Sequence, residues 1–183
     1  MKKIVISLLV IISVFVLSAC SLGNMISPKD TVKSFLDKYK NQDQEILDDL
    51  DETISSEYTG EYKERYKDLM INQYKNMDYE ITDEIVDGNT ALVTADITVY
   101  DYSNAIDNAN DYLTEHEEEF YKDEKEKSID NEKFLKYKLG LLENVSDKKT
   151  YTIEFSLTKE QDGWKMDSLT DSDIEKLHGI YSE

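Results

Sequence analysis

The sequence predicts an α+β fold in which N-terminal helices pack on a curved antiparallel sheet of about four strands. Two observations lead to this prediction. Apolar residues recur every three or four positions through residues 28–77, as in amphipathic helices. They alternate with polar residues through 79–99 and again through 151–157, as in half-exposed strands. Helices followed by hairpins of strands are typical of a sheet covered by helices on one face.

The helical part begins with a start signal, because Ser27 suits the N-cap, Pro28 the first helical position and Asp30 the first turn. Three helices are expected, the third from about Tyr58 to Met77. Their apolar stripes consist of Val32, Phe35, Leu36 and Tyr39; Ile46, Leu47, Leu50 and Ile54; and Tyr62, Tyr66, Leu69, Gln73 and Tyr74.

The strands are expected to form two hairpins. The first turns at Asp87-Gly88-Asn89, whose residues tolerate positive φ, and the second turns at 160–163 before Trp164. A short helix over 171–178 closes the chain, with Gly179 just after its end. The expected inward rows are Tyr79, Ile81, Asp83 and Ile85; Ala91, Val93, Ala95, Ile97 and Val99; and Tyr151, Ile153, Phe155 and Leu157.

Residues 102–149 form a helical insertion between strands two and three, and they are longer than a plain connection needs. The insertion covers the open face of the sheet or binds a partner. Residues 28–183 contain one proline and no glycine- and serine-rich linker, so a single α+β domain is predicted.

The first residues have the pattern of an export signal. Lys2 and Lys3 precede an uncharged apolar stretch that reaches Ala19. Leu17-Ser18-Ala19-Cys20 resembles the lipobox of bacterial lipoproteins. This resemblance implies cleavage between Ala19 and Cys20, with diacylglycerol and palmitate on Cys20. Residues 1–19 are then a removed signal peptide and 20–27 a short tether to the extracytoplasmic face of the cell membrane. The alternative is an uncleaved anchor helix.

The helix start, the first hairpin and the closing Tyr151-Thr152-Ile153-Glu154-Phe155 with Asp162-Gly163-Trp164-Lys165 resemble the nuclear-transport-factor-2-like superfamily, a cystatin-like α+β cone. Within it, the likeness is to small lipoproteins of Gram-positive bacteria. Members of that superfamily enclose a conical pocket between helix and sheet, and some use Asp, His or Tyr there for catalysis. The resemblance covers most of residues 28–170 and carries little information on function.

Charge limits the classes of partner. Removing residues 1–19 deletes two lysines and no acids, which takes the formal net charge from −19 to −21. Such a domain repels phosphate backbones, so we expect no nucleic-acid partner. We expect a monomer that contacts the membrane through its lipid. The acidic runs at 43–52 and 115–126 lack the spacing and the glycine of a calcium loop, so a solvated helix face is expected rather than a metal site.

No catalytic constellation is recognisable. His116 lies in a strongly polar run and His178 in the closing helix, neither with a nucleophile at a recognisable spacing. Asp83 interrupts an inward row; a buried, perturbed carboxylate is one interpretation, and an exposed strand end or a bulge is the favoured one. We expect no cofactor and no enzyme activity.

The candidate binding residues are tyrosines near one face of a helix: Tyr58, Tyr62, Tyr66 and Tyr74. Exposed, they would suit a peptide, glycan or protein; otherwise they cover the sheet as core residues. The prediction is therefore a membrane-anchored lipoprotein that binds an unknown small ligand or protein without catalysis. The alternatives are a small acid/base enzyme with a pocket in the cone, and an inhibitor or immunity-like protein for a basic partner.

Overall fold

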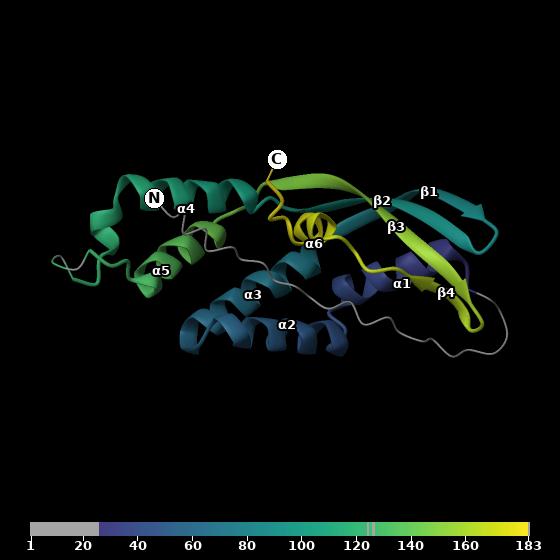
Figure 1. Ribbon diagram of the computed structural model, residues 1–183, viewed down its shortest axis with the longest axis horizontal. Coiled ribbons are helices and arrows are strands. Elements are labelled where there is room, and N and C mark those ends of the chain that lie inside the picture. The colour runs from purple at the N-terminus through teal and green to yellow at the C-terminus, as the bar shows by residue number, and fades with distance from the viewer. Residues whose placement is uncertain (1–25, 124, 126, 183) are drawn as a thin grey trace.

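The structure is a computed structural model that describes residues 26–123, 125 and 127–182. It confirms the α+β class, with helices N-terminal to the strands and a helical insertion between strands two and three (Figure 1). The elements are α1 (Pro28–Asn41), α2 (Gln44–Glu57), α3 (Gly60–Asn76), β1 (Asp78–Asp87), β2 (Thr90–Tyr100), α4 (Ser103–Glu115), the 3₁₀ helix η1 (Glu117–Phe120), α5 (Asn131–Leu142), β3 (Lys148–Glu160), β4 (Gly163–Met166) and α6 (Asp171–His178).

The helices lie on one face of the sheet in two layers (Figure 1). Helices α1 and α3 contact β2, α1 also contacts β1 and β4, and α6 contacts β2 and β3. Helix α2 packs on α3, on the side away from the sheet. The main core therefore lies between the sheet and the α1–α3 layer.

The start of α1 confirms the expected cap and adds a partner from the sheet. The Ser27 hydroxyl accepts a hydrogen bond from the Asp30 N–H at 3.0 Å. The Lys29 N–H donates to Oε1 of Glu84, on β1, at 2.9 Å. Two of the free N–H groups of the first turn are thus satisfied, and a carboxylate lies at the positive end of the helix dipole.

All four strands are antiparallel neighbours in the order β1-β2-β3-β4. The expected inward rows of β2 and β3 are buried throughout. The opposite face carries hydroxyl and carboxyl groups: Thr98 hydrogen-bonds Thr150 at 2.8 Å, and Thr152 donates to Asp96 at 2.7 Å. This polar face is stable in water without a cover.

The expected inward row of β1 is wrong beyond Ile81. The register shifts between Ile81 and Asp83, as at a β-bulge. Because side chains alternate along a strand, the extra residue moves Asp83 and Ile85 to the open face and turns Glu84 toward α1. Asp83 is exposed and Ile85 is 56% exposed, so the favoured interpretation of Asp83, a bulge at an exposed strand end, is confirmed.

The insertion does not cover the open face of the sheet. Helices α4 and α5 pack on each other and extend beyond the sheet as an arm, and α5 contacts α3 (Figure 1). Buried Ala109, Phe120 and Phe134 form a small core of the arm's own. The arm lies at the opposite end of the molecule from the β1–β2 turn and the start of α1.

Candidate functional site

The four tyrosines singled out in the sequence do not form one exposed surface. Tyr66 and Tyr74 are 2% and 0% exposed and belong to the main core, whereas Tyr58 and Tyr62 are half-buried. The rings of Tyr58 and Tyr66 stack with their centroids 5.2 Å apart. An exposed binding stripe is therefore wrong for Tyr66 and Tyr74, because α3 is covered by α1, α2 and β2. A binding role for Tyr58 and Tyr62 stays a prediction.

Aromatic rings fill the space between α1, α3 and the sheet. The Tyr39 ring meets the rings of Phe35 and Tyr74 edge to face, with centroids 5.2 and 5.1 Å apart. Phe35 in turn lies 6.1 Å from the ring of Phe155. Burial raises the pKa of Tyr39 and of Tyr74 above the ordinary value, so both hydroxyls stay protonated. Packed aromatic rings thus fill the interior between α1, α3 and the sheet.

A buried polar cluster joins α3, β2 and α6. The Gln73 side-chain amide donates to the carbonyl oxygens of Tyr100 and His178 at 3.0 and 2.9 Å, and its oxygen accepts from the Tyr100 N–H at 2.9 Å. Gln73 itself is 0% exposed. It thus supplies hydrogen-bond partners to buried backbone groups of Tyr100, at the end of β2, and of His178, at the end of α6. In the sequence, Gln73 interrupts the apolar stripe of the third helix. A polar residue at such a position indicates a buried side chain with hydrogen-bond partners.

His178 is buried at 1% exposure, which its position in the sequence did not reveal. Its Nε2 lies 3.3 Å from the Tyr74 hydroxyl, and its Nδ1 has no hydrogen-bond partner among the described residues. Burial lowers the pKa of His178 to about 4, so the imidazole is neutral near pH 7. The cluster acts as a structural clamp, since the groups bonded here are an amide, a phenol and backbone carbonyls rather than a nucleophile.

The arm carries a second set of aromatic side chains, called here the arm aromatic cluster: Tyr112, His116, Phe120, Phe134 and Tyr137. The Tyr112 ring lies between those of His116 and Tyr137, at centroid distances of 4.2 and 4.8 Å. The Tyr112 hydroxyl donates to Glu119 at 3.0 Å, and this bond is the largest cause of the raised pKa of Tyr112. His116, Tyr112 and Tyr137 are all half-buried.

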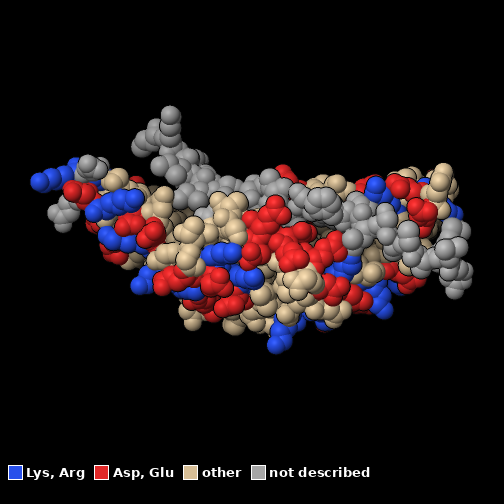
Figure 2. All heavy atoms as spheres, turned by 90° about the horizontal axis from the view of Figure 1, so that it is seen from below, with Lys and Arg blue, Asp and Glu red and all other residues tan. Residues whose placement is uncertain are grey.

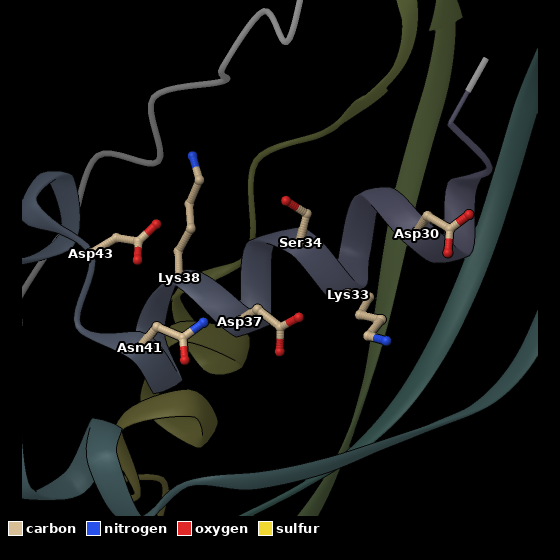
Figure 3. Close-up of a pocket in the computed structure, with 7 residues that line it drawn as sticks. All are labelled: Asp30, Lys33, Ser34, Asp37, Lys38, Asn41 and Asp43. Atoms are coloured by element: carbon tan, nitrogen blue, oxygen red, sulfur yellow. The ribbon is translucent and has the colours of Figure 1, made fainter. Parts of the chain in front are cut away.

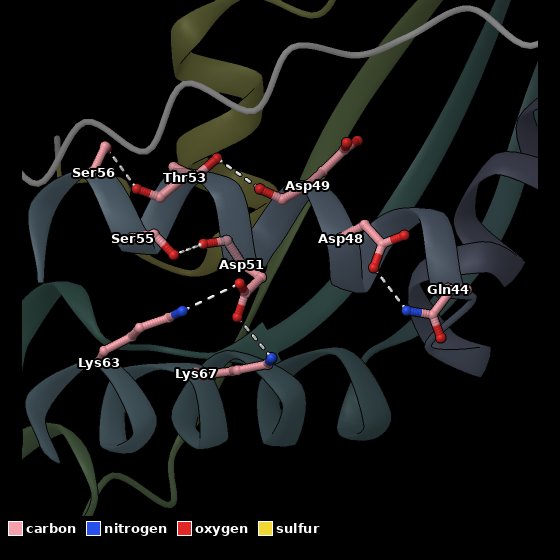
Figure 4. A network of polar contacts seen from close by, with 9 residues as sticks. All are labelled: Gln44, Asp48, Asp49, Asp51, Thr53, Ser55, Ser56, Lys63 and Lys67. Carbon is pink, nitrogen blue, oxygen red and sulfur yellow. Dashed lines mark hydrogen bonds and ion pairs between the residues drawn. The ribbon is translucent and has the colours of Figure 1, made fainter. Parts of the chain in front are cut away.

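Acidic side chains gather on the outer face of the helical layer (Figure 2). On α2, Asp51 accepts hydrogen bonds from Lys63 and Lys67 of α3 at 3.1 and 2.8 Å (Figure 4). These bonds lower the pKa of Asp51, with Lys67 as the largest cause. Partial burial and then neighbouring carboxylates raise the pKa of Asp49. No group of three metal-ligating side chains occurs in the described part of the chain.

A shallow depression lies along the outer side of α1 (Figure 3). Its volume is about 320 Å³, and its lining consists of Asp30, Lys33, Ser34, Asp37, Lys38, Asn41 and Asp43. One of these carboxylates, Asp37, accepts a hydrogen bond from the Tyr79 hydroxyl at 2.5 Å. Lys38 pairs with Glu45 at 3.1 Å. The depression is thus open and charged with both signs, and Asp37 and Lys38 are each paired with a residue outside its lining.

The predicted lipidation site, Ala19-Cys20, lies outside the described residues. Within residues 26–123, 125 and 127–182, no helix is both long and apolar enough to span a bilayer.

Comparison with known proteins finds a distant structural similarity. No protein-family model and no curated protein matches the chain. Among solved structures, a candidate lipoprotein, ycdA, from Bacillus subtilis is similar to this chain at 14% identity and a TM-score of 0.43. The match covers 84% of this chain and 48% of that protein, so the chain spans about half its length. At this level of similarity the resemblance to the nuclear-transport-factor-2-like superfamily stays a prediction.

Proposed function

We propose that the chain is a lipoprotein anchored through Cys20 to the extracytoplasmic face of a bacterial membrane. The lipobox-like Leu17-Ser18-Ala19-Cys20 and the charged and apolar segments before it support this assignment. Two or more acyl chains on one cysteine hold a protein stably in a bilayer, whereas a single chain binds marginally. Seven residues, Ser21 to Ser27, connect the anchor to α1 and span at most about 25 Å when extended.

The anchor is tested by fractionating cells that express the wild-type chain or its Cys20→Ala variant. The wild type is expected in the membrane fraction and the variant in the soluble fraction. Ser21→Ala, which keeps the cysteine, is the matched control. Full membrane retention of Cys20→Ala would contradict the anchor.

We further infer that the anchored domain is a binding module without catalysis and that its arm, residues 103–142, contacts a protein partner. The observation that carries this proposal is that the insertion stands clear of the sheet and holds half-buried rings, Tyr112, His116 and Tyr137, at its own surface. Half-exposed tyrosines combine apolar contact area with a polar tip, as in binding hot spots. The filled interior between α1, α3 and the sheet supports surface binding over a pocket enzyme.

The charge of the arm indicates the chemistry of the partner. Glu117, Glu118 and Glu119 are all exposed, and Glu119 accepts the hydrogen bond from the Tyr112 hydroxyl of the arm aromatic cluster. One cation, the Lys138 ammonium group, lies 5.7 Å from the Phe134 ring. A basic surface on the partner would complement the exposed carboxylates and would associate faster at low ionic strength.

The arm is tested with a photo-crosslinking residue in place of Tyr137, and with one in place of Ser156 on the open face of the sheet as control. We expect an adduct from position 137 that weakens with added salt and disappears in the Tyr112→Ala variant. Equal adducts from both positions would refute binding through the arm.

A second candidate function is favoured by the acidic outer face of α2 and α3 (Figure 2). An inhibitor or immunity-like protein could block a basic enzyme through this face, steered by a net charge of −21 without residues 1–19. Glu52 is exposed on α2. An adduct from a photo-crosslinking residue at position 52, with none from position 137, would favour this function.

A further inference from the structure

The exposed large apolar side chains of the described residues gather at one end of the molecule. They are Ile26, Ile85 and Val86, with 42%, 56% and 52% of their surface exposed. Ile26 directly precedes the Ser27 cap of α1, and Ile85 and Val86 lie next to the β1–β2 turn. The hydrogen bond from Lys29 N–H to Glu84 Oε1, at 2.9 Å, holds these two segments together.

The β3–β4 turn lies at the same end (Figure 1). It is flanked by Trp164 and by two cations, Lys159 and Lys165. Trp164 is half-buried, and its ring lies 5.8 Å from the Lys159 ammonium group. The Lys159 N–H donates to the Asn89 carbonyl in the β1–β2 turn at 2.8 Å, which joins the two turns. Tryptophan and lysine side chains are typical of segments that lie at a membrane interface.

The position of the anchor brings this end to the bilayer. Cys20 is separated from Ile26 by five residues, so Ile26 lies within about 22 Å of the lipid-bearing residue when the tether is extended. The β1–β2 turn reaches farther than the start of α1, because four residues from Glu84 to Gly88 add about 13 Å. The arm lies at the opposite end of the molecule (Figure 1).

We propose that this end, formed by Ile26, Ile85, Val86 and Trp164, rests on the lipid surface and directs the arm away from the membrane. The proposal rests on the anchor at Cys20. Five carboxylates, of Asp83, Glu84, Asp87, Glu160 and Asp162, and two ammonium groups, of Lys159 and Lys165, lie in or beside the two turns, and Lys165 pairs with Glu160 at 3.4 Å. Apolar contact rather than net charge therefore attaches this end. The contact holds the domain in one orientation, and the lipid on Cys20 holds it to the bilayer.

The test uses the full lipidated chain in phosphatidylcholine vesicles whose acyl chains carry bromine, a short-range quencher of tryptophan. Trp164 is the single tryptophan of the sequence, so Trp164→Phe combined with Val86→Trp or Tyr121→Trp places one probe on the lipid-facing end or on the arm. We expect the brominated lipid to lower the emission at positions 86 and 164 and to leave that at 121 unchanged. Val86→Ser should reduce the quenching at 164 without releasing the protein from the vesicles, because the strand register places Val86 and Trp164 on the same face of the sheet.

Failure of the proposal and failure of the anchor are distinguishable. Protein that stays on the vesicles with equal emission in brominated and ordinary lipid at positions 86 and 164 refutes the orientation alone. Protein that does not associate with vesicles refutes the anchor. A blue-shifted, unquenched emission at position 86 together with a dimeric mass in detergent would show that a second copy of the chain, and not lipid, covers this end.

Discussion

Gly179 is the position where one added methyl group should harm the fold most. It follows α6 with φ of 71°, and a Cβ there would overlap the carbonyl oxygen of Tyr100 and lie 2.5 Å from Nε2 of Gln73. The left-handed backbone alone costs an alanine about 1–2 kcal/mol. Displacing the Gln73 amide leaves buried donors unsatisfied, at a further cost of about 1–3 kcal/mol. The Gly179→Ala variant should therefore lose roughly 2–5 kcal/mol of unfolding free energy.

The matched control is Gly88→Ala, at φ of 58° in the β1–β2 turn, where the added Cβ meets no described atom within 4 Å. It should lose only the backbone cost, about 1–2 kcal/mol. For a chain of this size, each kcal/mol lowers Tm by about 2–4 °C. Thermal unfolding by circular dichroism should thus show a clearly larger loss for Gly179→Ala. Equal losses would refute the crowding around Gln73.

Three further predictions concern the clamp and the arm. The pKa of His178 is about 4 in the folded chain and 6.5 in the unfolded chain, so the unfolded chain binds a proton first as the pH falls. The contribution of His178 to the free energy of unfolding is therefore complete above pH 6.5. It falls by at most about 3 kcal/mol as the pH drops toward 4. Urea unfolding should show this slope in the wild type and lose it in His178→Gln; equal slopes would contradict the neutral buried imidazole. Arg65 holds Glu143 at the root of the arm through two bonds of 2.8 Å, and Glu143→Gln should cost under about 1 kcal/mol, a loss that disappears in high salt. Tyr112→Ala should speed amide hydrogen exchange within residues 103–142 and leave the sheet unchanged, whereas faster exchange in β2 and β3 would show that the arm is not a separate unit.

The sequence correctly predicted those features that depend on residues close together in the chain. The Ser27-Pro28 start of α1, the alternation in β2 and β3, and Gly179 after α6 were all confirmed, because caps, pleats and left-handed turns depend on a few adjacent residues. The insertion was found from its composition and length.

The signals that failed depend on contacts between distant segments. A bulge in β1 is decided by its pairing with β2 and by the bond from Lys29 to Glu84, so the alternation through Asp83 gave the wrong face. His178 is buried by Tyr74 and Gln73 of α3, more than a hundred residues earlier. The spacing of the tyrosines correctly predicted one face of α3. It did not show that α1 and α2 pack over α3 and bury Tyr66 and Tyr74.

We propose above all that Cys20 carries the lipid that holds this domain at the membrane. The most direct test is mass spectrometry of the N-terminal peptide of the protein isolated from a bacterium that expresses it. We expect a mature chain that begins at Cys20 with a diacylglycerol group on its sulfur. An intact peptide containing residues 1–19 joined to an unmodified Cys20 would contradict this proposal.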